Sequence, residues 1–112
     1  MDDIIKAAVL PIVPVCVPNV YAGEATEYCV YNYTEVPDNF GDDAPQGARY
    51  LIQVHWYFPF VQNVSATADV KAKKNAIQRA LADADMTWPT ITPAGDSVLE
   101  HYVFECEYVG EV

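Results

Sequence analysis

The chain has 112 residues, which gives room for a single domain (1–112) and one hydrophobic core. Hydrophobic residues make up 52% of it, a fraction that is typical of globular proteins and excludes a disordered chain. The chain carries 16 acidic and 6 basic residues, and its net charge of -10 excludes a sequence-specific reader of nucleic acid and disfavours binding to anionic membranes.

The N-terminal segment and the cysteines indicate a protein of the cytoplasm. The apolar stretch from Ala7 to Val20 is interrupted by three prolines and follows two aspartates, so we do not expect a signal peptide. The apolar stretches are also too short to cross a membrane. An odd set of three widely spaced cysteines predicts buried free thiols rather than a disulfide framework: Cys16, Cys29 and Cys106.

The first third of the chain predicts one helix and one strand. Asp2 to Leu10 carries apolar residues at helical spacing behind two acidic residues, and Pro11 ends it. Ile12 to Tyr21 contains two prolines, which favours an extended edge segment. Glu27 to Val36 alternates as a strand does, although neither of its faces is wholly polar.

The stretch from Ala48 to Phe58 predicts the central strand of the sheet. Its even-numbered residues are all apolar or aromatic, so we expect them to form a covered face, while Arg49, Gln53 and His55 lie on the other face. The preceding segment, Asp38 to Gly47, is rich in Asp, Gly and Pro, which predicts a long hairpin loop. Long loops of this kind are often functional.

The last part of the chain predicts a helix and two strands. Thr67 is the expected N-cap of a helix that runs to about Asp85, with an apolar stripe formed by Val70, Ile77, Leu81 and Ala84. A short strand is expected at Trp88 to Ile91 and a long one at Val98 to Val109. This order predicts an α+β domain with about four mainly antiparallel strands and two helices packed on one face.

No motif in the sequence predicts catalysis, a cofactor or a metal site. The nucleotide-binding, hydrolase and metalloprotease motifs are missing. His55 and His101 can share the open face of the sheet, but strand parity places Cys106 on the opposite face from His101. The acidic loop lacks the EF-hand spacing for Ca²⁺. Glu105 and Glu107 share a strand face, where we expect them to meet solvent or an interface.

Charge is segregated along the chain. Four of the six basic residues fall within nine positions of the second helix, on what we expect to be its exposed face: Lys71, Lys73, Lys74 and Arg79. A basic helix on an acidic body predicts head-to-tail self-association, and a solvated helix face is an equally good explanation. Under the first explanation, reversing the charges of Lys73 and Lys74 weakens assembly.

The order and character of these segments resemble those of the small tail-terminator, or tail-completion, proteins of long-tailed bacteriophages and prophages. The resemblance lies in the helix D-D-I-I-K-A-A-V-L, the segment P-V-C-V-P-N-V-Y-A-G and the strand T-E-Y-C-V-Y-N-Y. It continues through R-Y-L-I-Q-V-H-W-Y, the helix K-A-K-K-N-A-I-Q-R-A-L-A-D-A-D, the segment M-T-W-P-T-I and the strand H-Y-V-F-E-C-E-Y. It covers nearly the whole chain without a diagnostic motif.

The resemblance implies a structural protein of the virion, made in the cytoplasm of the bacterial host and without enzymatic activity or cofactors. Such proteins form a hexameric ring at the head-proximal end of the tail tube, end its polymerisation and join the tail to the head connector. DNA passes through the lumen without sequence-specific binding. The resemblance places contacts with the tube protein and the connector in the long acidic loop, at Asp38, Asn39, Phe40, Asp42 and Asp43.

Two alternatives stay open. A head-completion or connector protein of the phage neck also forms rings, and composition does not separate it from a terminator. A small cytoplasmic ligand-binding domain would instead use an aromatic sheet face, which we assign to Tyr31, Tyr33 and Tyr57. An enzyme is disfavoured by the missing motifs.

Overall fold

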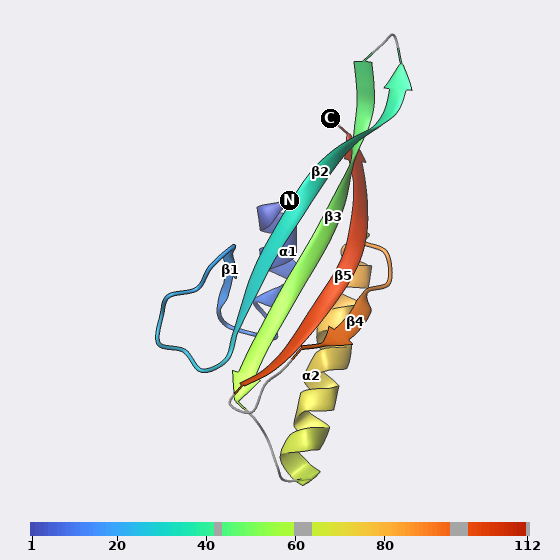
Figure 1. Cartoon of the computed structure of the whole chain (residues 1–112). Helices are drawn as coiled ribbons and strands as arrows, with labels where there is room; N and C mark the ends of the chain where they lie inside the picture. The colour runs from blue at the N-terminus through green and yellow to red at the C-terminus, as the bar shows by residue number, and fades with distance from the viewer. Residues whose placement is uncertain (42–43, 60–63, 95–98, 112) are drawn as a thin grey trace.

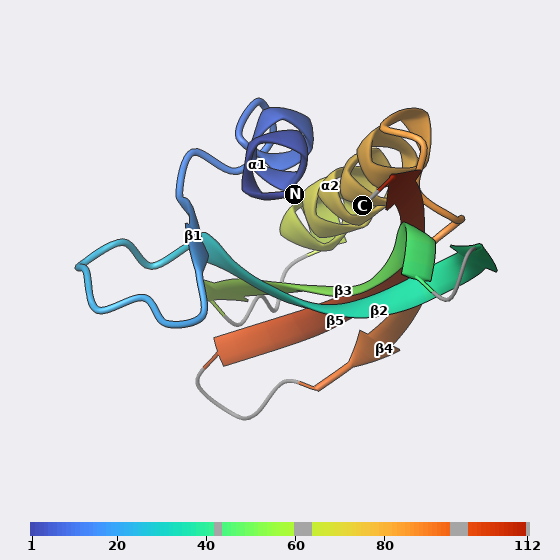
Figure 2. The same cartoon turned by 90° about the horizontal axis from the view of Figure 1, so that it is seen from above.

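The protein folds as one five-stranded sheet with two helices on one face (Figures 1 and 2). The computed structural model describes residues 1–41, 44–59, 64–94 and 99–111. The elements in chain order are α1 (Asp2–Val9), β1 (Cys16–Pro18), β2 (Tyr28–Gly41), β3 (Ala44–Pro59), α2 (Val64–Asp83), β4 (Thr90–Pro93) and β5 (Leu99–Glu111). The predicted α+β class is confirmed. No helix among the described residues is long and apolar enough to span a membrane.

The sheet has five strands in the order β1-β2-β3-β5-β4, one more than predicted. Three of its four ladders are antiparallel, and β1 pairs in parallel with β2. The additional strand is Cys16–Pro18, within the segment predicted to be an extended edge. Three residues, one of them Pro18, carry too little periodicity to identify a strand. The parallel pairing depends on how the 19–27 segment returns to β2.

The covered face of the sheet carries the core. Trp56, Val54 and Ile52 of β3 are fully or almost fully buried, as the alternation of that strand predicted. They lie beneath both helices, which sit on the same side of the sheet in Figure 2. The other strands contribute aligned neighbours: Cys29 and Tyr31 from β2, Phe104 and Cys106 from β5.

Each helix presents an apolar stripe to this core. In α1, Ile5 and Val9 are fully buried, and in α2 Ile77 and Leu81 are, which confirms an apolar stripe on each helix. The predicted Val70 is partly buried against this core, whereas Ala84 lies beyond the end of α2. The start of α2 was predicted wrongly, because the helix begins at Val64, three residues before the expected N-cap. It ends at Asp83 because Asp85 adopts a left-handed conformation with φ of 69°, a usual C-terminal cap geometry.

The predicted loop between β2 and β3 is largely a continuation of both strands. Pairing persists from Asp38↔Gly47 to Gly41↔Ala44, whereas β5 accompanies β3 only as far as Gly47. The paired backbone at 38–41 and 44–47, here called the hairpin arm, projects past the end of β5 (Figure 1). The molecule measures 58 × 26 × 23 Å along its principal axes, and the arm contributes to its length.

The loop prediction failed because Gly and Pro are also tolerated in a two-stranded ribbon, in which each strand pairs on one side only. The arm has an open edge on each side among the described strands, and Pro at an edge costs no ladder hydrogen bond. Two of the predicted contact residues, Asp42 and Asp43, lie outside the described residues. For Asp38, Asn39 and Phe40 the backbone alone is described, and all three belong to β2.

Candidate functional site

The second face of the sheet is left uncovered by the described helices (Figure 2). Its residues form rows, because partners in register on neighbouring strands project to the same side. One end is aromatic, with Tyr28, Tyr57 and His101 in one row. Closer to the other end of the face, a second row is polar and consists of Asn32, Gln53, Glu105 and Thr90. This surface is called the open face below.

The aromatic end of the open face is a continuous stack of rings. Tyr28 and Tyr57 stack with centroids 4.9 Å apart, and Tyr57 and His101 stack at 4.0 Å. Tyr21 extends the stack from the loop before β2, with its ring 4.5 Å from that of Tyr28. Because the ring faces are used on one another, this end is built as a rigid patch rather than an empty cleft for a planar ligand.

The two histidines of the open face are hydrogen-bonded to each other. His55 Nδ1 lies 2.8 Å from His101 Nε2, and Asn32 Nδ2 lies 3.4 Å from His55 Nε2. The amide nitrogen of Asn32 can only donate, so His55 Nε2 is the acceptor, and a neutral His55 then carries its proton on Nδ1 and donates it to His101. The prediction that both histidines share the open face is confirmed.

The electrostatics of this pair favour neutral rings. Burial lowers the pKa of His55, while the nearby Glu105 carboxylate opposes that shift. Burial also lowers the pKa of His101, and the neighbouring His55 lowers it further. The ring centroids lie 5.0 Å apart, close to the separation expected when two imidazole nitrogens point directly at each other. The pair is therefore arranged to share a proton rather than to converge on a metal ion.

The cysteines lie on the covered face, on the far side of the sheet from the histidines. All three thiols are free and buried, as the sequence predicted. Burial raises the pKa of Cys16 and of Cys106 to about 11, and it raises the pKa of Cys29 as well. Among the described residues, no group of three or more His, Cys, Asp or Glu side chains could hold a metal ion.

The polar end of the open face is hollowed. A depression of about 650 Å³ spans the three central strands and is bordered by the segment that leads from α2 to β4. Its lining combines amides, hydroxyls, two carboxylates and two large apolar side chains: Asn32, Thr34, Leu51, Gln53, Thr87, Trp88, Thr90, Glu105 and Glu107. We call this depression the polar hollow. The sequence paired only Glu105 and Glu107 on one face and placed Gln53 on the open face of its own strand. It did not bring these residues together, because they come from strands that are distant in the chain.

Trp88 stands at the rim of the polar hollow with 61% of its surface exposed. Its neighbours are held firmly: Thr87 exchanges two hydrogen bonds of 2.9 Å with Glu107, and the buried Pro89 accepts one of 2.9 Å from Gln78. Because the residues on both sides of Trp88 are anchored, its backbone has little conformational freedom and its exposed ring faces solvent from a fixed position. Leu51 in the hollow is 40% exposed, so the open face offers apolar surface at its centre.

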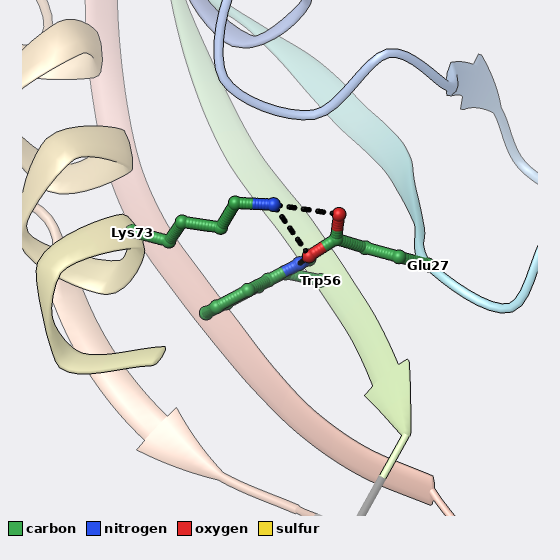
Figure 3. A network of polar contacts seen from close by, with 3 residues as sticks. All are labelled: Glu27, Trp56 and Lys73. Atoms are coloured by element: carbon green, nitrogen blue, oxygen red, sulfur yellow. Dashed lines mark hydrogen bonds and ion pairs between the residues drawn. The ribbon is translucent and has the colours of Figure 1, made fainter. Parts of the chain in front are cut away.

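The basic residues of α2 do not share one exposed face, which corrects the sequence interpretation. Figure 3 shows Lys73 reaching the carboxylate of Glu27, with Nζ 2.7 and 3.0 Å from its two oxygens. Trp56 Nε1 donates to the same carboxylate at 3.2 Å. Lys74 lies over the ring of Tyr102, with Nζ 5.6 Å from its centroid. Of the four, Lys71 and Arg79 are exposed, whereas Lys73 and Lys74 are partly buried.

The aromatic face expected for a ligand-binding domain is not formed by the residues we assigned. Tyr31 is 1% exposed beneath the helices and pairs with Val54, whereas Tyr57 pairs with Tyr28 on the open face. Tyr33 has the parity of Tyr31, so it too lies on the covered side. The tyrosine that joins Tyr57 is Tyr28. The mixed polarity of both faces of β2 concealed this parity.

Comparisons with known proteins leave the family of the chain open. No protein-family model matches it, and no curated protein matches its sequence.

Proposed function

We propose that this protein is a ring-forming structural component of a phage tail, a tail terminator at the head-proximal end of the tail tube. The observation that carries the proposal is the open face, which combines exposed apolar side chains in one hollow with two carboxylates that form no ion pair with another described residue. Surfaces of that composition on small domains commonly mark protein interfaces. A protein whose role is assembly requires such a surface, and the resemblance in element order supports the same role.

Two further features support assembly. The hairpin arm leaves backbone donors and acceptors free along both of its edges among the described strands, so it can add to a strand of another chain. Val109 of β5 is 59% exposed, on the same face as the polar hollow. We infer that the arm and the open face contact the tube protein, the connector or further copies of the chain.

The charge and the thiols support a passive role. The net charge of -10 disfavours retention of DNA on a ring wall, which suits passage of DNA through a lumen. Thiols held protonated by burial are poor nucleophiles, which disfavours catalysis by Cys16 and Cys106. A neck or head-completion protein would use the same surfaces. The two roles differ in the position of the ring, which lies at the end of the tail tube for a terminator and at the head for a neck protein.

A small ligand-binding domain is the second candidate, and the polar hollow is the observation that favours it. A volume of about 650 Å³ falls in the range of small-molecule sites, and amide and hydroxyl groups converge there. Under this candidate the ligand is neutral or cationic, because Glu105 and Glu107 repel anions.

Electron microscopy of particles made without this gene tests the proposal. Overlong or ragged tails that lack heads are expected for a tail terminator. Free tails of normal length beside heads that leak DNA would assign the protein to the neck. Intact virions would overturn both structural roles and favour the ligand-binding domain.

A further inference from the structure

The outward side of α2 carries a row of basic and polar side chains with small alanine side chains beside it. Lys71, Asn75 and Arg79 follow one another at intervals of four residues, which places them on successive turns of one side of the helix. All three are exposed. The exposed Ala72 and Ala76 lie between Lys71 and Arg79 in the sequence, and the exposed Ala68 precedes them. No ion pair within the described part of the chain involves Lys71 or Arg79. We call this surface the α2 stripe.

The polar hollow is the matching acidic surface. Glu105 and Glu107 project into it from β5, and neither makes an ion pair with another described residue. Leu51 lies opposite Glu107 across the β3–β5 ladder, and Trp88 stands at the rim. The hollow therefore has an apolar centre next to two negative charges, while the α2 stripe has small apolar residues between two positive charges.

We propose that the α2 stripe of one copy of the chain docks in the polar hollow of the next. The inference rests on the ring assembly proposed above and names the two surfaces that form it. The carboxylates of Glu105 and Glu107 recognise the cations of Lys71 and Arg79, and Trp88 packs against the helix. Trp and Arg are the residues that most often dominate interface energies.

The placement of the two surfaces determines the symmetry. Helix α2, which carries the α2 stripe, lies on one side of the sheet (Figure 2). The strand register places the residues that line the polar hollow on the reverse face. A contact between them is heterologous, so an open chain of copies keeps one unused α2 stripe at one end and one unused polar hollow at the other until it closes. Closure gives a ring, and two-fold symmetric dimers are not expected.

Exchange of the charges tests this contact directly. One variant carries Lys71→Glu and Arg79→Glu, and a second carries Glu105→Lys and Glu107→Lys. Each variant alone places like charges on both surfaces, so we expect its dissociation constant for self-association to rise by about a hundredfold. Mixed in equal amounts, the two variants again offer complementary surfaces, and we expect the oligomer to return with alternating subunits. Light scattering after size-exclusion chromatography measures each state.

A matched control separates a local effect from a change in net charge. Glu24→Lys with Glu35→Lys makes the same change in charge as the hollow variant, at exposed residues outside both surfaces, and should leave the oligomer unchanged. Circular dichroism establishes that every variant is folded, which is expected because the substituted side chains are exposed or partly exposed.

The inference is overturned if the wild-type chain stays monomeric at high concentration, or if either folded variant assembles like the wild type. It is also overturned if the mixture fails to assemble while the wild type does. These outcomes leave the microscopy of gene-deleted particles unaffected. Overlong tails without heads, together with a failed charge exchange, would retain the tail terminator and reject only the contact between the α2 stripe and the polar hollow.

Discussion

The two faces of the sheet are built from the same strands and differ in almost every other respect. On the covered face, Trp56, Tyr31 and Phe104 are removed from water, and the polar contact at its edge is the carboxylate of Glu27. On the open face, many side chains are half-buried or exposed; Asn32, His55 and His101 hydrogen-bond to one another, and the residues at the polar end surround a hollow. The covered face therefore carries most of the folding free energy, and the open face is free to be specialised for contacts outside the chain.

Truncation of a tryptophan on each face is the strongest way to test this difference. Trp56→Ala is expected to lower the free energy of unfolding by about 3–5 kcal/mol, since it leaves a cavity in the core. The matched variant is Trp88→Ala, which removes the same atoms from an exposed position. Urea denaturation monitored by circular dichroism measures both. Similar losses for the two variants would contradict the division of roles between the faces.

The Glu27 network tests the edge of the covered face. Glu27→Ala leaves the indole N–H of Trp56 without its acceptor, which should cost about 1–3 kcal/mol of stability. Lys73→Ala removes only a partly exposed ion pair, whose expected contribution is about 0.2–1 kcal/mol. Denaturant unfolding of both variants measures the difference, with Glu24→Ala as the control for loss of an exposed carboxylate. Equal losses for Glu27→Ala and Lys73→Ala would show that the indole hydrogen bond contributes nothing.

The histidine pair predicts a smaller, pH-dependent effect on the open face. Because burial lowers the pKa of both rings below their unfolded value of 6.5, protons bind the unfolded chain more readily than the folded one. The contribution to stability is therefore complete above about pH 6.5. It declines as the pH falls through the lowered pKa values. Melting temperatures measured between pH 5 and pH 8 should show this decline.

A variant in which both histidines are replaced, His55→Gln with His101→Gln, isolates their share of that decline. Carboxylates elsewhere in the chain also titrate in acid, and they do so equally in the two proteins. We expect the wild type to lose more stability than the variant between pH 7 and pH 5. Parallel profiles would mean that the two rings titrate alike in the folded and unfolded chain.

Trp88→Ala is expected to have the smallest effect on folding and a distinct effect on assembly. Loss of an exposed side chain should change the free energy of unfolding by no more than about 0.5 kcal/mol. If the open face is an interface, the same variant weakens self-association, which sedimentation velocity measures. Unchanged association would remove Trp88 from the interface, and a large loss of stability would show that its ring is part of the core.

Prediction from sequence succeeded for the covered face and was incomplete for the open one. Ile77 and Leu81 follow the helical period of apolar residues, and β3 follows the two-residue period of a strand. Each element buries only one side, so local periodicity was sufficient to identify the buried residues. The basic helix was misjudged because proximity in sequence does not establish a shared face. Lys73 points towards Glu27, 46 residues away in the chain, while Lys71 points outward.

By itself, the sequence determined the α+β class, the buried stripes of both helices, the covered face of the central strand and the burial of the thiols. Each of these follows from local spacing and from the transfer of apolar side chains out of water. Tertiary structure alone decided the parallel pairing of β1, the extension of the hairpin arm, the hydrogen bond between His55 and His101, and the polar hollow. Those features join segments that are distant in the chain, and their geometry depends on strand register and on the path of the connections, which no local pattern encodes.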